Sequence, residues 1–219
     1  YQRMQNQLRV VGFEQNQLNA AMEDLFNIAQ KTRTPLEGTV NLFGKLAQAA
    51  GELGKSQADM LRFTELTGKA LAIQGTSTAG TVAVLLQLSQ AMGEGIVRAQ
   101  EFNSMIENAR PLLLAAATGI DEAGGSVSRL RTMVLAGELS SKRFFDGVLR
   151  GSEILDEKFG ATVPTIGQAL TVLNTAWTKF IGESALGQTI LSVVGGTLIT
   201  IAENFEQIAL FVVTATAAI

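Results

Sequence analysis

The sequence predicts an all-α protein, a bundle-like domain of many short helices followed by an apolar helical segment. Apolar residues recur at spacings of three and four through most of the chain, which is the periodicity of an amphipathic helix. Glycine, proline and capping residues divide this pattern into short lengths. Of the 219 residues 47% are hydrophobic, which is enough to build a core and argues against disorder.

The first third of the chain predicts three helices. The first is expected over about residues 2–31, with Gly12 as a possible break. The Thr34 hydroxyl is expected to cap a second helix that has Pro35 at its first position. Ser56 is expected to cap a third helix in the same way, because an acidic residue follows it three positions on.

The most individual stretch is the centre of the chain, residues 85–111. Its apolar residues form one helical stripe that is interrupted by Gly93 and Gly95, and Pro111 ends the segment that follows. A positive φ is expected where the two glycines break the helix, which makes Gly93 and Gly95 candidate hinge residues. Pro111, which ends the next segment, is the third candidate. The alternative interpretation is a plain helix–loop–helix corner.

Two loops match ligand-binding motifs only in part. Gly75 and Gly80 have the spacing of a phosphate loop, but Thr81 stands where its lysine belongs, which favours a helix cap and turn. Asp121 and Glu122 precede glycines, yet the alternating oxygen ligands and the distal glutamate of a calcium loop are missing. A solvated turn is therefore the favoured interpretation.

The second half of the chain predicts further helices over about residues 112–118, 126–135 and 140–159. Pro164 opens another helix, whose apolar residues recur at helical spacing. Trp177 is interpreted as a core anchor of this helix rather than as a platform for a ligand.

Charge density falls abruptly in the last quarter of the chain. Residues 160–219 contain four charged side chains, those of Lys179, Glu183, Glu203 and Glu206. The 19 residues from 184 to 202 are uncharged but only moderately hydrophobic, so a buried or self-associating helix and a membrane span both remain open. Glu203 and Glu206 are candidates for a polar face in a membrane or pore, or else lie at a water-exposed helix turn.

The composition leaves little room for catalysis. The chain contains neither Cys nor His, which removes thiolate nucleophiles, imidazole bases and most transition-metal sites. Glu101 and Glu107 are six residues apart and do not share a helix face, so they do not form a carboxylate pair for glycoside cleavage. The net charge of −3 gives no electrostatic footprint for nucleic acid. We therefore predict no enzyme, no cofactor, no metal and no sequence-specific nucleic-acid binding.

Several short motifs, in one order between about residues 12 and 182, closely resemble a domain of phage tail length tape measure proteins. The central motif is Gln87, Leu88, Ser89, Gln90 and Ala91, followed by Gly93, Gly95, Arg98, Glu101, Phe102, Asn103, Ser104, Glu107 and Pro111. Residues 25–35, 42–47 and 53–56 resemble the family before this centre, and residues 136–140, 169–174 and 180–182 resemble it afterwards. Where the family usually has Leu-Arg-Gly before its Glu-Phe-Asn-Ser element, this chain has Val97, Arg98, Ala99 and Gln100.

The resemblance implies a structural protein that sets tail length as the tail tube polymerises, lies in the tube lumen and takes part in genome ejection through the host envelope. It implies a homo-oligomer that contacts the tail tube protein, assembly chaperones and tail-tip proteins in the virion. We expect a tape-measure-like helical domain over residues 1–182 and an apolar segment over 183–219, both from a longer chain. A membrane-permeabilising protein, in which 183–219 forms the pore, and a plain helical assembly module are the alternatives.

Overall fold

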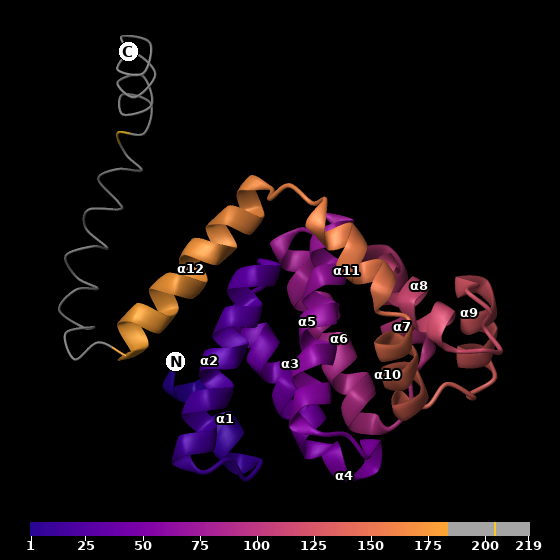
Figure 1. The fold of residues 1–219 in the computed structure, drawn as a ribbon, viewed down its shortest axis with the longest axis horizontal. Helices are drawn as coiled ribbons and strands as arrows, with labels where there is room; N and C mark the ends of the chain where they lie inside the picture. Colours follow the sequence, from indigo (N-terminus) through magenta and orange to yellow (C-terminus); the bar gives the residue numbers. More distant parts are fainter. Residues whose placement is uncertain (184–203, 205–219) are drawn as a thin grey trace. The chain divides into compact units, whose positions relative to one another are not determined.

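The computed structural model describes residues 1–183 and Asn204, and the described part is helical (Figure 1). In chain order the helices are α1 (Gln2–Val10), α2 (Gln15–Thr32), α3 (Leu36–Gln48), α4 (Ala50–Leu53), α5 (Gln57–Gln74), α6 (Thr78–Glu94), α7 (Ala99–Asn108), α8 (Arg110–Gly119), α9 (Val127–Leu135), α10 (Ser141–Arg150), α11 (Glu153–Gly160) and α12 (Ile166–Glu183). Between residues 1 and 183 no strand occurs, although Ile96 and Ser140 form an isolated antiparallel bridge. The all-α, multi-helix fold class is thus confirmed.

The chain divides into two units, Tyr1–Ala176 and Trp177–Ile219. The first unit contains α1 to α11 and the first part of α12. Of the second unit, the structure describes the end of α12 and Asn204.

Side-chain caps explain why many helices begin where they do. Ser56, Ser77, Ser126 and Ser140 each accept a hydrogen bond from the backbone N–H three residues later, at the starts of α5, α6, α9 and α10. The sequence predicted the Ser56 cap, and the Ser77 cap agrees with the helix cap and turn that it favoured over a phosphate loop between Gly75 and Gly80. The predicted Thr34 cap is wrong, because Pro35 occupies the capping position of α3 and the Thr34 hydroxyl is instead hydrogen bonded to that of Thr39, 3.1 Å away.

Two predicted long helices are divided in the structure. The helix expected over residues 2–31 is broken into α1 and α2 around Gly12, whose φ of +94° is a conformation that other residues rarely adopt. The helix expected over 140–159 is divided into α10 and α11 at Gly151 and Ser152.

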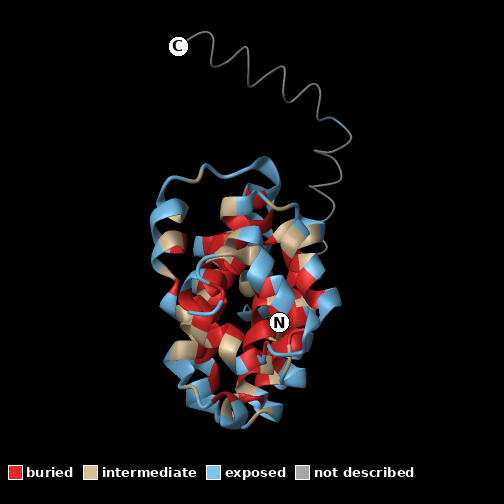
Figure 2. Cartoon of the chain, turned by 90° about the vertical axis from the view of Figure 1, so that its right-hand side faces the viewer, coloured by how far each residue is buried: buried red, intermediate tan, exposed pale blue. Residues whose placement is uncertain are grey.

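The core lies between α3, α5, α6, α8 and α10, and Figure 2 shows its buried residues enclosed by exposed ones. Its largest fully buried side chains are aromatic: Phe43, Phe63, Phe102, Phe144 and Phe145. Phe63 of α5 stacks on Phe145 of α10, with ring centroids 4.5 Å apart, and meets the edge of Phe144 at 6.4 Å. These contacts join α5 to α10, which are far apart in the sequence.

Helices α8 and α10 approach closely because small residues face each other. A Cβ atom placed on Gly119 of α8 would lie 2.0 Å from the carbonyl oxygen of Gly147. A Cβ atom on Gly151 would lie 2.0 Å from the carbonyl oxygen of Ala115. Since real atoms never come this close, the crossing of the two helices requires glycine at both positions.

Candidate interaction surface

The candidate hinge glycines occupy different positions. Gly93 lies within α6, and Gly95 follows the helix with a φ of +77°. A side chain on Gly93 would meet only the Lys45 side chain, at an ordinary distance of 3.8 Å. The structure therefore assigns the positive-φ conformation to Gly95 and not to Gly93.

Backbone and side-chain hydrogen bonds fasten the chain after Gly95 to the start of α10. The Ser141 N–H donates to the Gly95 carbonyl at 3.0 Å, and the Ser141 hydroxyl donates to the Ala91 carbonyl at 2.6 Å. The Val97 N–H donates to the Leu139 carbonyl at 3.0 Å. These bonds bring together segments that are more than 40 residues apart, which the sequence pattern did not predict.

The other candidate residues lie elsewhere. Pro111 lies in the first turn of α8, where its missing N–H leaves no hydrogen bond unmade, and the helix break before it is at Ala109. Glu203 and Glu206, like nearly all of the 183–219 segment, lie outside the described residues.

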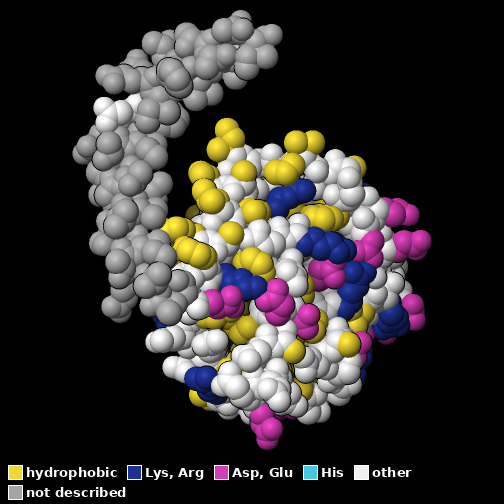
Figure 3. All heavy atoms as spheres, turned by 60° about the vertical axis from the view of Figure 1, so that its left-hand side comes forward, with side chains coloured by type: hydrophobic (Ala, Val, Ile, Leu, Met, Phe, Trp, Pro, Cys, Tyr) yellow, Lys and Arg dark blue, Asp and Glu magenta, His cyan; other side chains and the backbone are white. Residues whose placement is uncertain are grey.

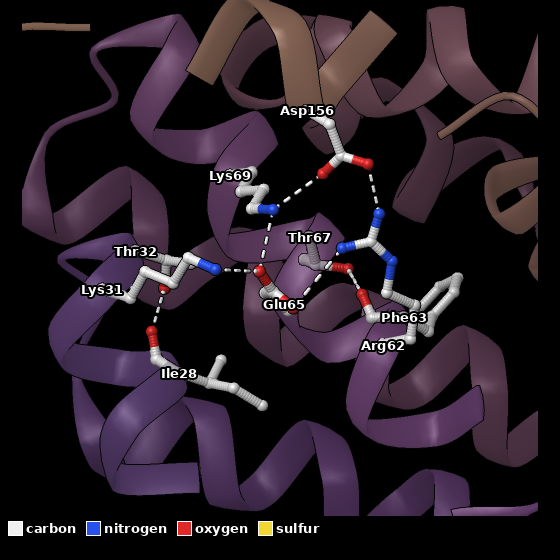
Figure 4. A network of polar contacts seen from close by, with 9 residues as sticks. All are labelled: Ile28, Lys31, Thr32, Arg62, Phe63, Glu65, Thr67, Lys69 and Asp156. Atoms are coloured by element: carbon white, nitrogen blue, oxygen red, sulfur yellow. Dashed lines mark hydrogen bonds and ion pairs between the residues drawn. The ribbon is translucent and has the colours of Figure 1, made fainter. Parts of the chain in front are cut away.

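A network of ion pairs joins α2, α5 and α11 (Figure 4). The Lys69 ammonium, on a side chain that is 7% exposed, lies 2.8 Å from Glu65 and 2.7 Å from Asp156. Lys31 reaches Glu65 from α2, and Arg62 pairs with both carboxylates. Lys69 therefore connects two helices whose residues are 87 positions apart.

The network keeps its carboxylates charged. Partial burial raises the pKa of the Glu65 carboxyl, but hydrogen bonds from Lys31 and Lys69 outweigh it and hold this pKa below its usual value. Burial likewise raises the pKa of Asp156, and hydrogen bonds from Lys69 and Arg62 reverse the effect. Three cations therefore surround two carboxylates, and the ion pairs connect α2, α5 and α11.

A second set of polar contacts continues from α11 to α12. Arg33, at the end of α2, lies over the Phe159 ring with 5.4 Å between its guanidinium carbon and the ring centroid. The same guanidinium donates to the Thr162 hydroxyl at 3.2 Å and to the Gln168 side-chain oxygen at 3.4 Å. Gln30 donates to the Val172 carbonyl at 3.1 Å. These bonds fix the rotation of α12 about its own axis.

As a result, α12 buries polar residues and exposes apolar ones. Gln168, Thr171 and Thr175 are buried, and the Thr171 hydroxyl lies 3.4 Å from that of Thr78 at the start of α6. The exposed apolar residues form the stripe that we call the α12 stripe: Val163 (84% exposed), just before the helix, then Ile166 (82%), Leu170 (60%) and Leu173 (65%). Figure 3 shows hydrophobic side chains gathered along the upper margin of the described surface, where α12 begins. The face of α12 that packs on the domain is therefore polar, and the face that is exposed is apolar.

The sequence pattern predicted this stripe but not its direction. Its spacing was interpreted as a core-facing stripe anchored by Trp177, whereas the structure leaves Trp177 half-buried and the aliphatic residues before it exposed. The signal that was missed is on the opposite face, where Gln168 and Thr171 form hydrogen bonds with the domain.

Other kinds of site are not found in the part of the chain that the structure describes. Over residues 1–183 no group of three or more acidic side chains is placed to hold a metal ion. None of the described helices has both the length and the hydropathy of a membrane span.

Comparison with known proteins gives one match. No curated protein and no solved structure matches the sequence. Residues 1–185, which include every described helix, match the family model of the tape measure protein. The chain therefore belongs to the tape measure protein family.

Proposed function

We propose that residues 1–182 form a compact assembly module of a tape measure protein that sets tail length while the tail tube polymerises. Membership of the family makes the chain a structural protein of the phage tail that associates with other tail components in the virion. Within the tail, we propose, it lies in the tube lumen as a homo-oligomer, in contact with the tube protein, assembly chaperones and tail-tip proteins.

The shortness of the helices is the observation that supports a module rather than a ruler. A ruler made of continuous helix gains about 1.5 Å per residue. The longest described helices, α2, α5 and α12, have 18 residues each, so each spans only about 27 Å. The first unit, Tyr1–Ala176, is folded around one core. Removing residues from this unit is therefore expected to disrupt its packing rather than to shorten an extended rod.

Removal of residues 56–74 from the full-length protein tests this proposal. The deletion takes out α5, which carries Phe63 of the core and Lys69 of the ion-pair network. We expect tails to be absent, as counted by electron microscopy of infected cells. The exposed double variant Glu153→Gln and Glu157→Gln serves as the control and is expected to form normal tails. Virions with tails shortened by about 30 Å, the length of 19 helical residues, would show instead that this region measures length.

For genome ejection we propose that residues 183–219 contact the host membrane once the protein leaves the tail. This segment is poor in charge, and Glu203 and Glu206 are the acidic residues that a polar face of a pore would require. Replacing both by Leu is expected to spare tail assembly and to impair DNA delivery. Normal infectivity together with normal potassium efflux from the host would contradict the channel and leave a packing role for the segment.

A further inference from the structure

We propose that the α12 stripe is a self-association surface, against which the same stripe of a second copy of this chain packs. The proposal rests on the proposed homo-oligomer and names its contact surface. Three properties of α12 support it: the spacing of its exposed residues, the charge of its flanks and the area that it offers.

The spacing of the exposed residues is that of a helix–helix seam. On α12, Ile166, Leu170 and Leu173 are separated by four and three residues, and in the sequence Trp177 and Phe180 continue the alternation, while Val163 extends the apolar surface just before the helix. This is the heptad pattern, in which apolar residues of one helix insert between those of another. A second helix with the same pattern matches this alternation.

The flanks of the stripe favour a copy of the same helix. Gly167, Ala169, Asn174 and Ala176 lie beside the stripe, and all four are exposed. Charged residues at flanking positions set partner choice, because opposite charges across the seam attract and like charges repel. Residues 160–178 contain no charged side chain, so two identical stripes meet no repulsion. The small flanking side chains also let two backbones approach closely.

The area of the stripe indicates a reversible contact. A large aliphatic side chain carries on the order of 100 Å² of apolar surface. With its small flanking residues, each copy therefore offers roughly 500–600 Å², so a pair buries about 1,000–1,200 Å², at the lower end of specific interfaces. Pairing through α12 is thus expected to depend on protein concentration.

Cross-linking of the complete chain tests the proposal, because the chain has no native cysteine. Leu173→Cys places a thiol at the last residue of the stripe, so two thiols meet when the copies run parallel and lie about 15 Å apart along the axis when they run antiparallel, a distance that a long bismaleimide bridges. Leu135→Cys places a thiol at an equally exposed position, 69%, at the end of α9 and serves as the matched control. With a bismaleimide reagent we expect the cross-linked dimer to form at least tenfold faster at position 173 than at position 135.

A charge on the stripe supplies the second comparison. Leu170→Glu, added to the Leu173→Cys chain, is expected to reduce the dimer yield at least tenfold, whereas Leu135→Glu in the same chain leaves it unchanged. Circular dichroism and thermal unfolding verify that each variant is folded. Leu135 and Leu170 are both exposed, so neither substitution places a charge in the core. Equal rates at positions 173 and 135, or a yield that Leu170→Glu does not lower in a folded chain, would overturn the proposal.

The outcome is independent of the proposed assembly role. The cross-linking experiment uses purified protein and no tails, so a negative result removes this surface and leaves the deletion test of residues 56–74 unaffected. Conversely, shortened tails in the deletion test would contradict the proposed assembly module. A cross-link specific to position 173 would still identify α12 as a contact between copies.

Discussion

At the scale of single residues, Lys69 differs from an ordinary surface lysine because it is buried and pairs with two carboxylates. Its stem is buried, and its ammonium lies within 2.8 Å of two carboxylates and 5.7 Å from the centroid of the Phe159 ring. A buried charge is tolerated only when such partners replace water. Because α5 and α11 meet through this residue, it supports α11 and the chain that leads to α12.

Lys69→Met tests the strength of this connection. The substitution keeps the buried stem and removes the charge, while Lys31 and Arg62 still pair with Glu65 and Asp156. We expect a loss of about 2 kcal/mol in the free energy of unfolding, less than for a buried carboxylate left with no partner. Arg3→Met is the control, since the Arg3–Glu37 pair is 90% and 69% exposed and should cost less than about 0.5 kcal/mol. Equal urea midpoints for the two variants would contradict this assignment.

The two glycines after the centre of α6 differ in what they require. Gly95→Ala places a side chain at a φ of +77° and is expected to cost about 1 kcal/mol. Gly93→Ala lies inside a helix, where its Cβ atom meets only the Lys45 side chain at an ordinary distance, so a gain of about 0.5 kcal/mol is expected. Thermal unfolding of the two single variants measures the difference. A loss at Gly93 equal to that at Gly95 would mean that both glycines are needed by the fold.

At the scale of elements, the crossing of α8 and α10 makes the sharpest demand on residue type. Gly119→Ala brings a Cβ atom within 2.0 Å of a backbone carbonyl oxygen, so the two helices must separate. We expect a loss of about 3 kcal/mol in the free energy of unfolding. Gly160→Ala is the matched control, because nothing lies within 4 Å of its Cβ position, and it should change stability by less than about 1 kcal/mol. A Gly119→Ala protein as stable as the control would show that the helices adjust freely.

The sequence predicted elements better than it predicted their contacts. Ser56 marked the start of α5 because capping is local, and Gly12 marked the break between α1 and α2 for the same reason. The Lys69–Asp156 pair, by contrast, joins residues 87 positions apart, and a local sequence pattern does not predict such a contact.

The α12 stripe shows a second kind of limit. Helical spacing identifies an apolar face but does not say whether that face meets the core of the same chain or a partner. On α12 the opposite face is also able to pack, through Gln168, Thr171 and hydrogen bonds to α2 and α6. When both faces have a use, periodicity alone cannot assign the direction.

At the scale of the whole molecule, the first unit holds together through contacts between distant parts of the chain. Phe63 stacks on Phe145, Lys69 pairs with Asp156, and the start of α10 is hydrogen bonded to the end of α6. A domain with such contacts unfolds as a unit rather than piece by piece. Its contribution to tail assembly should therefore depend on the fraction of folded molecules.

This dependence predicts how a destabilised domain affects tails. In a phage that carries Gly119→Ala, fewer folded modules are available, so we expect fewer tails, most markedly at high temperature. Each tail that does form contains a folded module and an unchanged number of residues, so its length should equal that of the wild type. Electron microscopy gives both the count and the length distribution, with Gly160→Ala as the control. A normal count of tails with a shifted mean length would contradict the module, because it would mean that packing of α8 against α10 sets length directly.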